Sequence, residues 1–453
     1  MHKLFFDRAL LQDGWRDRVL LTLSGGQIVG VEANVQEPAD ADRIKGVALP
    51  GVGNVHSHTF QRGFAGLTER RGAEDDHFWT WRESMYRFVG DLTPDDVEAI
   101  AAMAFVEMVE GGFTAVAEFH YLHHGADGQP YADPAELSRR VVAAAAATGI
   151  GLTLLPVFYA HSGFGGQTPT LGQRRFVSDL DLFARLHASA GEAVSELPIG
   201  GIGIAPHSLR AVTVEELRYL LDLHGSGAVH IHIAEQEREV EECLAVTGAR
   251  PVDWLLGHIP IDSRWCLIHA THMTVEETRR FAHTGATAGL CPITESNLGD
   301  GIFPTTEFIR EKGRFGVGSD SNVQISLRDE MRTLCYSQRL RDRARNRLAS
   351  PHRSSGRVLF DSVAEGGAQA LSLPIGAIAP GRRADIIVLD PDHIALAERT
   401  GDAILDSWIF ASTHSPVSEV YLNGKRVVEN GRHAARSGIE ATFRSVMKRL
   451  AGA

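Results

Sequence analysis

The stretch Leu49-Pro-Gly-Val-Gly-Asn-Val-His-Ser-His58 places two histidines one residue apart at the end of a short apolar run. Residues i and i+2 of an extended chain face the same way, so the imidazoles of His56 and His58 can reach one cation. Further segments of the same kind follow downstream: His232-Ile-Ala-Glu235, Ile268-His-Ala-Thr-His272 and Gly318-Ser-Asp320. Together they predict a site for metal-assisted hydrolysis.

Short apolar runs alternate with amphipathic helical stretches between about residues 46 and 375, which predicts an α/β fold with a parallel sheet buried on both faces. The eight runs are Val47–Val55, Phe113–Phe119, Gly151–Phe158, Gly201–Ala205, Ala228–Ile233, Trp265–Ile268, Ala286–Leu290 and Phe315–Gly318. Thr93-Pro94, Thr213 and Thr274 are typical of helix starts between them. Eight such units predict a TIM-like (β/α)8 barrel.

Residues able to do chemistry come directly after these runs. They are His56 and His58, His120 and Tyr121, His207, His232 and Glu235, His269, and Asp320. In (β/α)8 barrels the active site lies at the carboxyl ends of the strands. Chance would not place histidines at so many strand ends, so the pattern supports both the fold and the site.

The two ends of the chain have a different pattern. Residues 1–45 contain alternating strand-like runs, and a second set, with a hairpin turn at Asn423-Gly424, lies between about 376 and 436. We expect residues 1–47 and 375–453 to form one small composite β-sandwich, ending in a helix over Gly438–Leu450. Residues 48–374 would form the barrel.

Composition excludes several classes of function. The 453 residues carry a net charge of −12, which disfavours nucleic acid and anionic membranes as partners. No apolar run approaches the roughly 20 residues of a membrane span, and Asp7 and Arg8 interrupt the apolar start that a signal peptide would need. The four cysteines are widely spaced, which fits reduced thiols in the cytoplasm.

The metal ligands that we predict are His56, His58, His232 and Asp320. A catalytic zinc takes three or more nitrogen or oxygen ligands and keeps a position for water. His230 also lies in a His-x-His pattern with His232, but His232 is nearer the strand end, so we expect His230 inside the barrel. Asp320 could instead cap a helix, and the two roles are compatible.

Two further residues are candidates for proton transfer. Glu235 is three residues after His232, where it could move protons between water, substrate and leaving group. His269 directly follows the sixth run and should face the cavity, whereas His272 should lie on the loop or cap the next helix. No lysine occurs between Lys45 and Lys312, so a lysine on the fourth strand cannot bridge two metals. We therefore predict one metal.

These motifs resemble the amidohydrolase superfamily, in its mononuclear deaminase branch. The segments His58-Thr-Phe-Gln-Arg-Gly-Phe-Ala-Gly-Leu, Asp76-His-Phe-Trp-Thr-Trp-Arg-Glu, Ala117-Glu-Phe-His-Tyr-Leu-His-His and Pro206-His-Ser-Leu-Arg are similar to the bacterial formimidoylglutamate deiminases of histidine degradation. The similarity covers essentially the entire chain, and the metal and proton-transfer positions show no departure.

The resemblance implies hydrolysis of N-formimino-L-glutamate to N-formyl-L-glutamate and ammonia, with one Zn²⁺, or Fe²⁺, on the four predicted ligands. It places Glu235 and His269 at the reacting centre. It implies substrate contacts at Gln61, Arg82, Tyr121, His207 and Arg210. A dicarboxylate substrate needs guanidinium partners, which the two arginines supply. A homodimer is expected, as is common for such barrels.

Two alternatives stay open. Another deaminase of the same branch, acting on guanine, cytosine or an adenosine-like base, would want aromatic stacking in its loops, and Trp79-Thr-Trp81 is compatible with that. A barrel without catalytic activity, serving as a scaffold or binding protein, would usually lack some of the metal ligands. Ammonia release and metal analysis would separate these alternatives.

Overall fold

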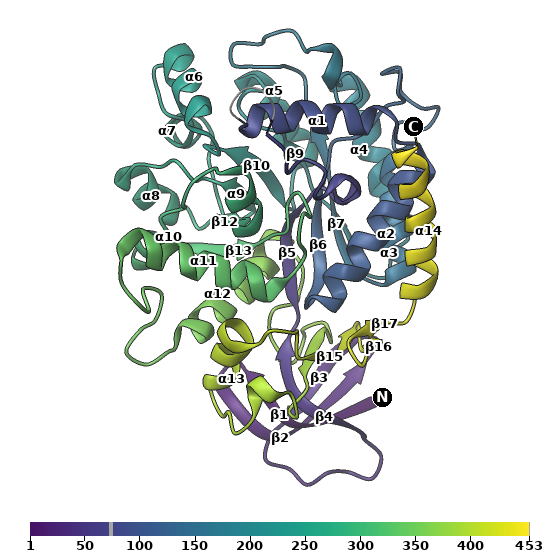
Figure 1. The fold of residues 1–453 in the computed structure, drawn as a ribbon, viewed down its shortest axis with the longest axis vertical. Coiled ribbons are helices and arrows are strands. Elements are labelled where there is room, and N and C mark those ends of the chain that lie inside the picture. Colours follow the sequence, from purple (N-terminus) through teal and green to yellow (C-terminus); the bar gives the residue numbers. More distant parts are fainter. Residues whose placement is uncertain (72–75, 453) are drawn as a thin grey trace.

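The computed structural model describes residues 1–71 and 76–452. Its larger part is a parallel barrel with helices outside, and its smaller part is a β-sheet unit at the opposite end of the molecule from helix α1 (Figure 1). The predicted α/β fold, a (β/α)8 barrel with a composite β-structure from both chain ends, is therefore confirmed.

The barrel strands run in chain order around the axis. They are β5 (Val52–Ser57), β6 (Phe113–His120), β7 (Gly151–Phe158), β8 (Gly200–Ile202), β9 (Ala205–Pro206), β10 (Val229–Ile233), β11 (Trp265–His269), β12 (Thr287–Leu290) and β13 (Arg314–Val317). Neighbouring strands pair in parallel, and β8 and β9 both pair with β7. Parallel bridges Ser208↔His232 and Ser57↔Asp320 close the ring.

Helices alternate with the strands, as expected for βα units. They are α1 (Phe78–Gly90), α2 (Pro94–Glu110), α3 (Glu136–Thr148), α4 (Leu180–Ser195), α5 (Val214–His224), α6 (Glu237–Thr247), α7 (Pro251–His258), α8 (Val275–Ala282), α9 (Pro292–Leu298), α10 (Thr305–Arg310), α11 (Leu327–Asp342) and α12 (Ser355–Ala370). Thr93, Thr213 and Thr274 cap α2, α5 and α8 with capping boxes, as predicted.

Two of the predicted runs differ from the observed strands. The run Val47–Val55 is two strands, because β4 (Asp42–Pro50) ends at a proline and pairs with the terminal sheet, whereas β5 enters the barrel. The run Gly201–Ala205 is interrupted, so that the fourth position of the barrel consists of β8 and β9. Pro50 has no N–H for a continuing ladder, which explains the first break.

The terminal sheet interleaves strands from both ends of the chain. Its order is β17-β16-β15-β14-β4-β1-β2-β3, and the two ends join where β14 pairs antiparallel with β4. Besides β4, its strands are β1 (His2–Leu11), β2 (Gly14–Ser24), β3 (Gln27–Glu32), β14 (Ile386–Leu389), β15 (Val417–Leu422), β16 (Lys425–Glu429) and β17 (Arg432–His433). Asn423 and Gly424 both have positive φ, as the predicted hairpin turn requires.

The C-terminal segment adds a short helix, α13 (Ala403–Asp406), and the predicted terminal helix, α14 (Arg436–Ala451). Helix α14 lies beside α2 on the outside of the barrel (Figure 1). We propose the division into residues 1–47 with 375–453 and residues 48–374 as two units, with β4 carrying the terminal sheet three residues past the first boundary, to Pro50. Among the described residues no helix is both long and apolar enough to span a bilayer.

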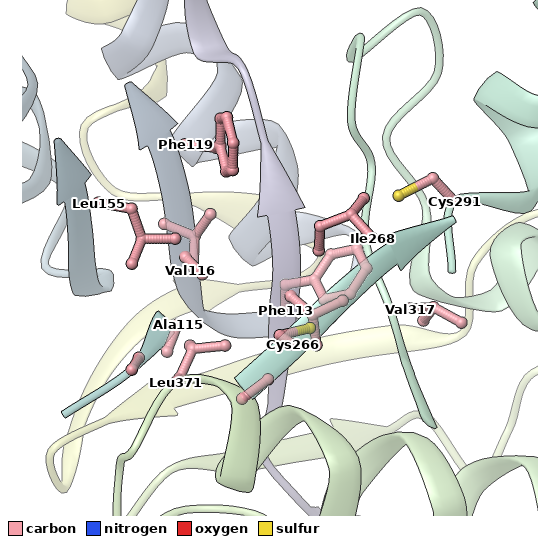
Figure 2. Packing of buried hydrophobic residues seen from close by; sticks show 14 of the residues in the cluster. Phe113, Ala115, Val116, Phe119, Leu155, Cys266, Ile268, Cys291, Val317 and Leu371 are labelled. Carbon is pink, nitrogen blue, oxygen red and sulfur yellow. The ribbon is translucent and has the colours of Figure 1, made fainter. Parts of the chain in front are cut away.

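The barrel core consists of apolar side chains from successive strands. Figure 2 shows Val116 and Phe119 of β6, Leu155 of β7 and Ile268 of β11 among them. A smaller, separate cluster that includes Leu4 and Phe6 fills the terminal sheet unit. The packed strands are a rigid support for the side chains at their carboxyl ends.

Candidate metal centre and active site

His56 and His58 stand side by side at the end of β5. Their Nε2 atoms are 3.2 Å apart, and both side chains are buried. Gly318, at the end of β13, lets this segment approach closely, because a Cβ there would lie 2.7 Å from the backbone N and O of His56. The Gly-Ser-Asp motif therefore brings Asp320 next to the histidine pair.

His232 and Asp320 complete a group of four ligand-type side chains. The Nε2 atom of His232 is 3.0 Å from the Nε2 atom of His56. Oδ1 of Asp320 lies 3.4 Å from Nε2 of both His56 and His58. The four predicted metal ligands thus gather around His56, from β5, β10 and the segment after β13. Ligand atoms that all lie within 4.8 Å of one another form two sets that share His56, namely His56 with His58 and Asp320, and His56 with His232 and His269.

The geometry of this group fits a divalent cation. Two atoms that bind one tetrahedral zinc at about 2.0–2.1 Å lie about 3.3 Å apart, close to the separations seen here. Nδ1 of His58 is 2.8 Å from the carbonyl oxygen of Phe119, and Nδ1 of His232 is 3.0 Å from that of His207. Each Nδ1 therefore donates its hydrogen, which leaves the lone pair of Nε2 facing the group. Nδ1 of His56 is buried and has no hydrogen-bond partner within residues 1–71 and 76–452, so its hydrogen can sit on either ring nitrogen. A cation at this point would accept the Nε2 lone pairs of all three histidines.

The charge states of the group also suit a metal. Burial lowers the pKa of His56 to about 4 and the pKa of His58 to about 3, and it holds the pKa of His232 well below its usual range. The imidazoles are therefore neutral near pH 7, which is the form that binds metal. Burial alone would raise the pKa of Asp320, but His56 and the other histidines hold it below its ordinary value.

Glu235 and His269 lie beside the four ligands. Nε2 of His269 is 3.7 Å from Oε1 of Glu235 and 3.7 Å from Oδ2 of Asp320, and its Nδ1 is 3.2 Å from Oε1 of Glu295. Burial alone would lower the pKa of His269, but the three carboxylates raise it to about 10. Burial raises the pKa of Glu235 to about 7, so this carboxyl can both take and give a proton near neutrality.

The backbone around these side chains adopts conformations that non-glycine residues seldom take. Ala234, His269, Ala270 and Asp320 all have positive φ, between 44° and 66°. Each such residue costs of the order of 1 kcal/mol or more, and clusters of them occur at functional sites. Here they turn the chain sharply at the ends of β10, β11 and β13, where the ligands lie.

A pocket opens directly above this group. It is lined by His58, His232, Glu235, His269 and Asp320 and by all five residues that the resemblance implies as substrate contacts: Gln61, Arg82, Tyr121, His207 and Arg210. Nε2 of Gln61 donates a hydrogen bond of 2.7 Å to the hydroxyl of Tyr121. The Nε atoms of Arg82 and Arg210 are buried, and neither has a hydrogen-bond partner in the described part of the chain.

The histidines that were expected outside the metal group lie elsewhere. His230 is buried inside the barrel, where its Nε2 contacts the carbonyl oxygen of Ala370 at 2.8 Å. His272 is on the loop after β11, and its Nε2 is 2.8 Å from the carbonyl oxygen of Asp300; Thr274, not His272, caps α8. His120, in contrast, was expected among the strand-end residues able to do chemistry, but it is the buried last residue of β6 and does not line the pocket.

Several residues at the site were not predicted from the sequence. Those that line the pocket are Phe78, Met85, Tyr86, Tyr159, Phe176 and Leu298. Trp81, from the segment considered above for aromatic stacking, lines it as well. Glu295 contacts His269, and the sulfur of Cys291 lies within 4.8 Å of ligand atoms of His269 and Asp320. Tyr159 directly follows β7, so the strand-end rule could have found it. Glu295 lies within helix α9 and not at the end of a strand, so the strand-end rule could not have found it.

A (β/α)8 barrel with three histidines and one aspartate converging at its strand ends defines a metal-dependent hydrolase of the amidohydrolase type. The comparisons with known proteins agree. The model of the Amidohydrolase family matches residues 47–427, and that of the "Formimidoylglutamate deiminase HutF, N-terminal domain" matches residues 1–45. This chain therefore belongs to the amidohydrolase family.

Individual relatives give finer detail. The chain is 49% identical to a formimidoylglutamate deiminase from Pseudomonas aeruginosa, over 99% of this chain and 100% of that protein. It is 28% identical to an 8-oxoguanine deaminase of the same organism, over 89% of this chain and 85% of the relative. The crystal structure of an amidohydrolase from Brucella melitensis has a TM-score of 0.95 and 49% identity, and covers 99% of this chain and 100% of its own.

Proposed function

We propose that this protein hydrolyses N-formimino-L-glutamate to N-formyl-L-glutamate and ammonia, as a hydrolase of C–N bonds in linear amidines. The full-length identity of 49% to a formimidoylglutamate deiminase supports this. The observation that carries it in the structure is the pair of arginines in the pocket beside the metal ligands, the buried Arg210 and the half-buried Arg82, each with a buried Nε atom. They suit the two carboxylates of this substrate.

We propose one Zn²⁺ as the cofactor, held by His56, His58, His232 and Asp320. When bound, such a cation supplies Lewis acidity, which polarises the formimino group and lowers the pKa of water toward neutrality. Fe²⁺ shares these ligands, so metal analysis of the purified protein decides the identity. A preparation that turns over with no bound transition metal would overturn this part of the proposal.

The protons of the reaction pass through residues of this chain. Water adds its oxygen to the formimino carbon, the bond from this carbon to the terminal nitrogen breaks, and both water protons end on that nitrogen, which leaves as ammonia. Glu235, with its pKa near 7, takes a proton from the water and gives it to the departing nitrogen. Asp320 and His269 orient the water, and His269 can hold a proton at Nε2 between two carboxylates.

The remaining lining residues position the substrate. Arg82 comes from α1 and Arg210 from the loop after β9, so carboxylates at the two ends of the glutamate moiety can each meet a guanidinium. Gln61, Tyr121 and His207 supply further polar groups beside the metal ligands.

We also propose a homodimer, which light scattering would test. A cytoplasmic location is proposed because all four cysteines are free thiols.

An assay of ammonia release tests the proposal directly. The purified protein should release ammonia from N-formimino-L-glutamate and not from guanine, cytosine or adenosine. Release from a nucleobase alone would assign the protein to another deaminase of the family. Glu235→Gln should lower turnover by about 10²–10⁴-fold while zinc stays bound. Near-normal turnover of this variant would remove Glu235 from the scheme.

A further inference from the structure

Trp79, in the first turn of α1, is surrounded by three guanidinium groups from separate βα segments. The Cζ atom of Arg82 lies 4.5 Å from the centre of its ring, that of Arg238 4.6 Å, and that of Arg210 5.5 Å. Arg82 belongs to α1, Arg210 to the loop after β9 and Arg238 to α6. Helices α1 and α6 lie at the same end of the barrel (Figure 1).

Two of these arginines pose an electrostatic problem. Arg82 and Arg210 both line the pocket, and the Nε atom of each is buried without a hydrogen-bond partner in residues 1–71 and 76–452. Two positive groups that share one cavity repel each other. The negative charges of Glu239 and Glu235 act on Arg210 and partly offset this repulsion. A protein carboxylate hydrogen-bonded to both arginines would offset it further, but it would also occupy the N–H donors that a substrate carboxylate needs.

An aromatic face offers a different solution. The ring of tryptophan attracts a cation through its quadrupole, with the guanidinium placed over the ring. The N–H bonds of a guanidinium lie in its own plane, so this contact leaves the donors available. Trp79 can therefore hold Arg82 and Arg210 in place without competing for their hydrogen bonds.

The third arginine lies on the outer side of this arrangement. Arg238 is mostly exposed and forms a salt bridge of 2.6 Å with Glu242, one turn later on α6. Its contact with Trp79 links the first turn of α1 to the first turn of α6. Because Trp79 itself does not line the pocket, it can influence a ligand only through its neighbours.

We propose that Trp79 is a positioning residue, which orients Arg82 and Arg210 for a ligand with two carboxylates. This inference rests on the proposed function for the identity of that ligand. The inference also gives Trp79 a role other than the one considered above for the Trp79-Thr-Trp81 segment, which was stacking on a nucleobase. Trp81 lines the pocket, whereas the ring of Trp79 is engaged by arginines.

The test compares Trp79→Leu, which removes the aromatic face, with Trp79→Phe, which keeps a smaller one. Trp254→Leu is the matched control, because Trp254 stacks on His258 at 4.4 Å in α7 and does not line the pocket. For each zinc-loaded protein we would measure kcat and KM for N-formimino-L-glutamate. We would also measure the Kd of N-formyl-L-glutamate by calorimetry, which requires no turnover.

The expected result is a change in binding with little change in the chemical step. Trp79→Leu should raise KM and Kd by about ten-fold, the effect of one partly buried cation–π contact, while kcat stays within about two-fold. Trp79→Phe should recover most of the affinity, and Trp254→Leu should match the wild type. A purely structural role would instead lower kcat and zinc content, and Phe would not restore the affinity for N-formyl-L-glutamate.

The outcomes separate this inference from the proposed function. If the wild type releases no ammonia but binds N-formyl-L-glutamate, the proposed reaction is wrong, and the Kd series still decides the role of Trp79. If Trp79→Leu binds N-formyl-L-glutamate as tightly as the wild type, the inference is wrong whatever the activity. If the wild type neither reacts nor binds, both are wrong.

Discussion

Glu295 holds His269 from the side away from the pocket, with Oε1 of the carboxylate 3.2 Å from Nδ1 of the imidazole. The same oxygen accepts a hydrogen bond of 2.9 Å from the backbone N–H of Cys291, which fixes its position. Nδ1 of His269 therefore carries a hydrogen, which it donates to Glu295, and Nε2 of the same ring faces Glu235 and Asp320. Carboxylates that contact catalytic histidines in this way set their orientation and basicity.

Glu295→Gln should therefore lower turnover although Glu295 does not line the pocket. The amide keeps the size of the side chain but removes the negative charge that stabilises the imidazolium of His269. We expect kcat for ammonia release to fall about 10–100-fold with zinc content unchanged. Glu276→Gln, on the exposed side of α8, is the control. An unchanged kcat would show that His269 is oriented without Glu295.

Removal of the metal should abolish activity and weaken the fold. Dialysis against a chelator leaves His56, His58 and His232 close together in a buried site without the cation that would hold them. We expect ammonia release to stop and to return on addition of Zn²⁺. Thermal unfolding should shift to lower temperature, because a ligand at ~1,000 times its Kd contributes about 4 kcal/mol. Chelated protein with full turnover and an unchanged Tm would contradict the metal centre.

The proximity of the proposed metal ligands could be predicted from the sequence, and the reason is topological. In a (β/α)8 barrel the carboxyl ends of all strands meet at one opening, so His56 and His232 at the ends of β5 and β10, and Asp320 after β13, were expected near one another once the strands were found. Contacts such as that of Glu295 could not be predicted in this way. The contact between Glu295 and His269 depends on the path of the chain after β12 and on the direction in which the side chain of Glu295 leaves helix α9.

Strand boundaries show the same limit. The apolar run through Pro50 gave no sign that its first half pairs with β14, more than three hundred residues later in the chain. Likewise, the split of the fourth strand into β8 and β9 depends on pairing with β7 and not on local hydrophobicity. Periodicity indicates that a segment is extended and buried, but long-range pairing decides where it ends.

Substitution of either pocket arginine should weaken substrate binding more than it slows the reaction. Arg82→Met and Arg210→Met keep the aliphatic length and remove the charged donors. We expect KM for N-formimino-L-glutamate to rise about 10–100-fold for each, the usual value of a charged hydrogen-bonded pair. Arg218→Met, at an exposed position of α5, should leave KM unchanged. If all three variants had the same KM as the wild type, the carboxylates of the substrate would have to bind elsewhere.

Glu118, inside the barrel on β6, should make the stability of the protein depend on pH. Its Oε1 accepts hydrogen bonds of 2.7 Å from both the backbone N–H and the hydroxyl of Thr59, next to His58. Burial raises the pKa of Glu118 to about 7 from 4.5, in spite of these bonds. The folded state therefore holds this proton more tightly than the unfolded state. As a result, the free energy of unfolding should fall as pH rises from about 4.5 to about 7.

Glu118→Gln removes this titration, so the variant should gain stability relative to the wild type as pH rises. Between pH 5 and pH 8 the relative gain should approach about 2.5 kcal/mol, because part of the shift from 4.5 to about 7 lies below pH 5 and the rest gives about 1.8 pKa units. Urea unfolding of the metal-free proteins at both pH values measures it, and exposed Glu276→Gln should show no such trend. The metal-free state is chosen because zinc binding to the neighbouring histidines is itself pH-dependent. If the difference between variant and wild type is the same at both pH values, Glu118 is ionised in the folded protein, and the hydrogen bonds from Thr59 outweigh its burial.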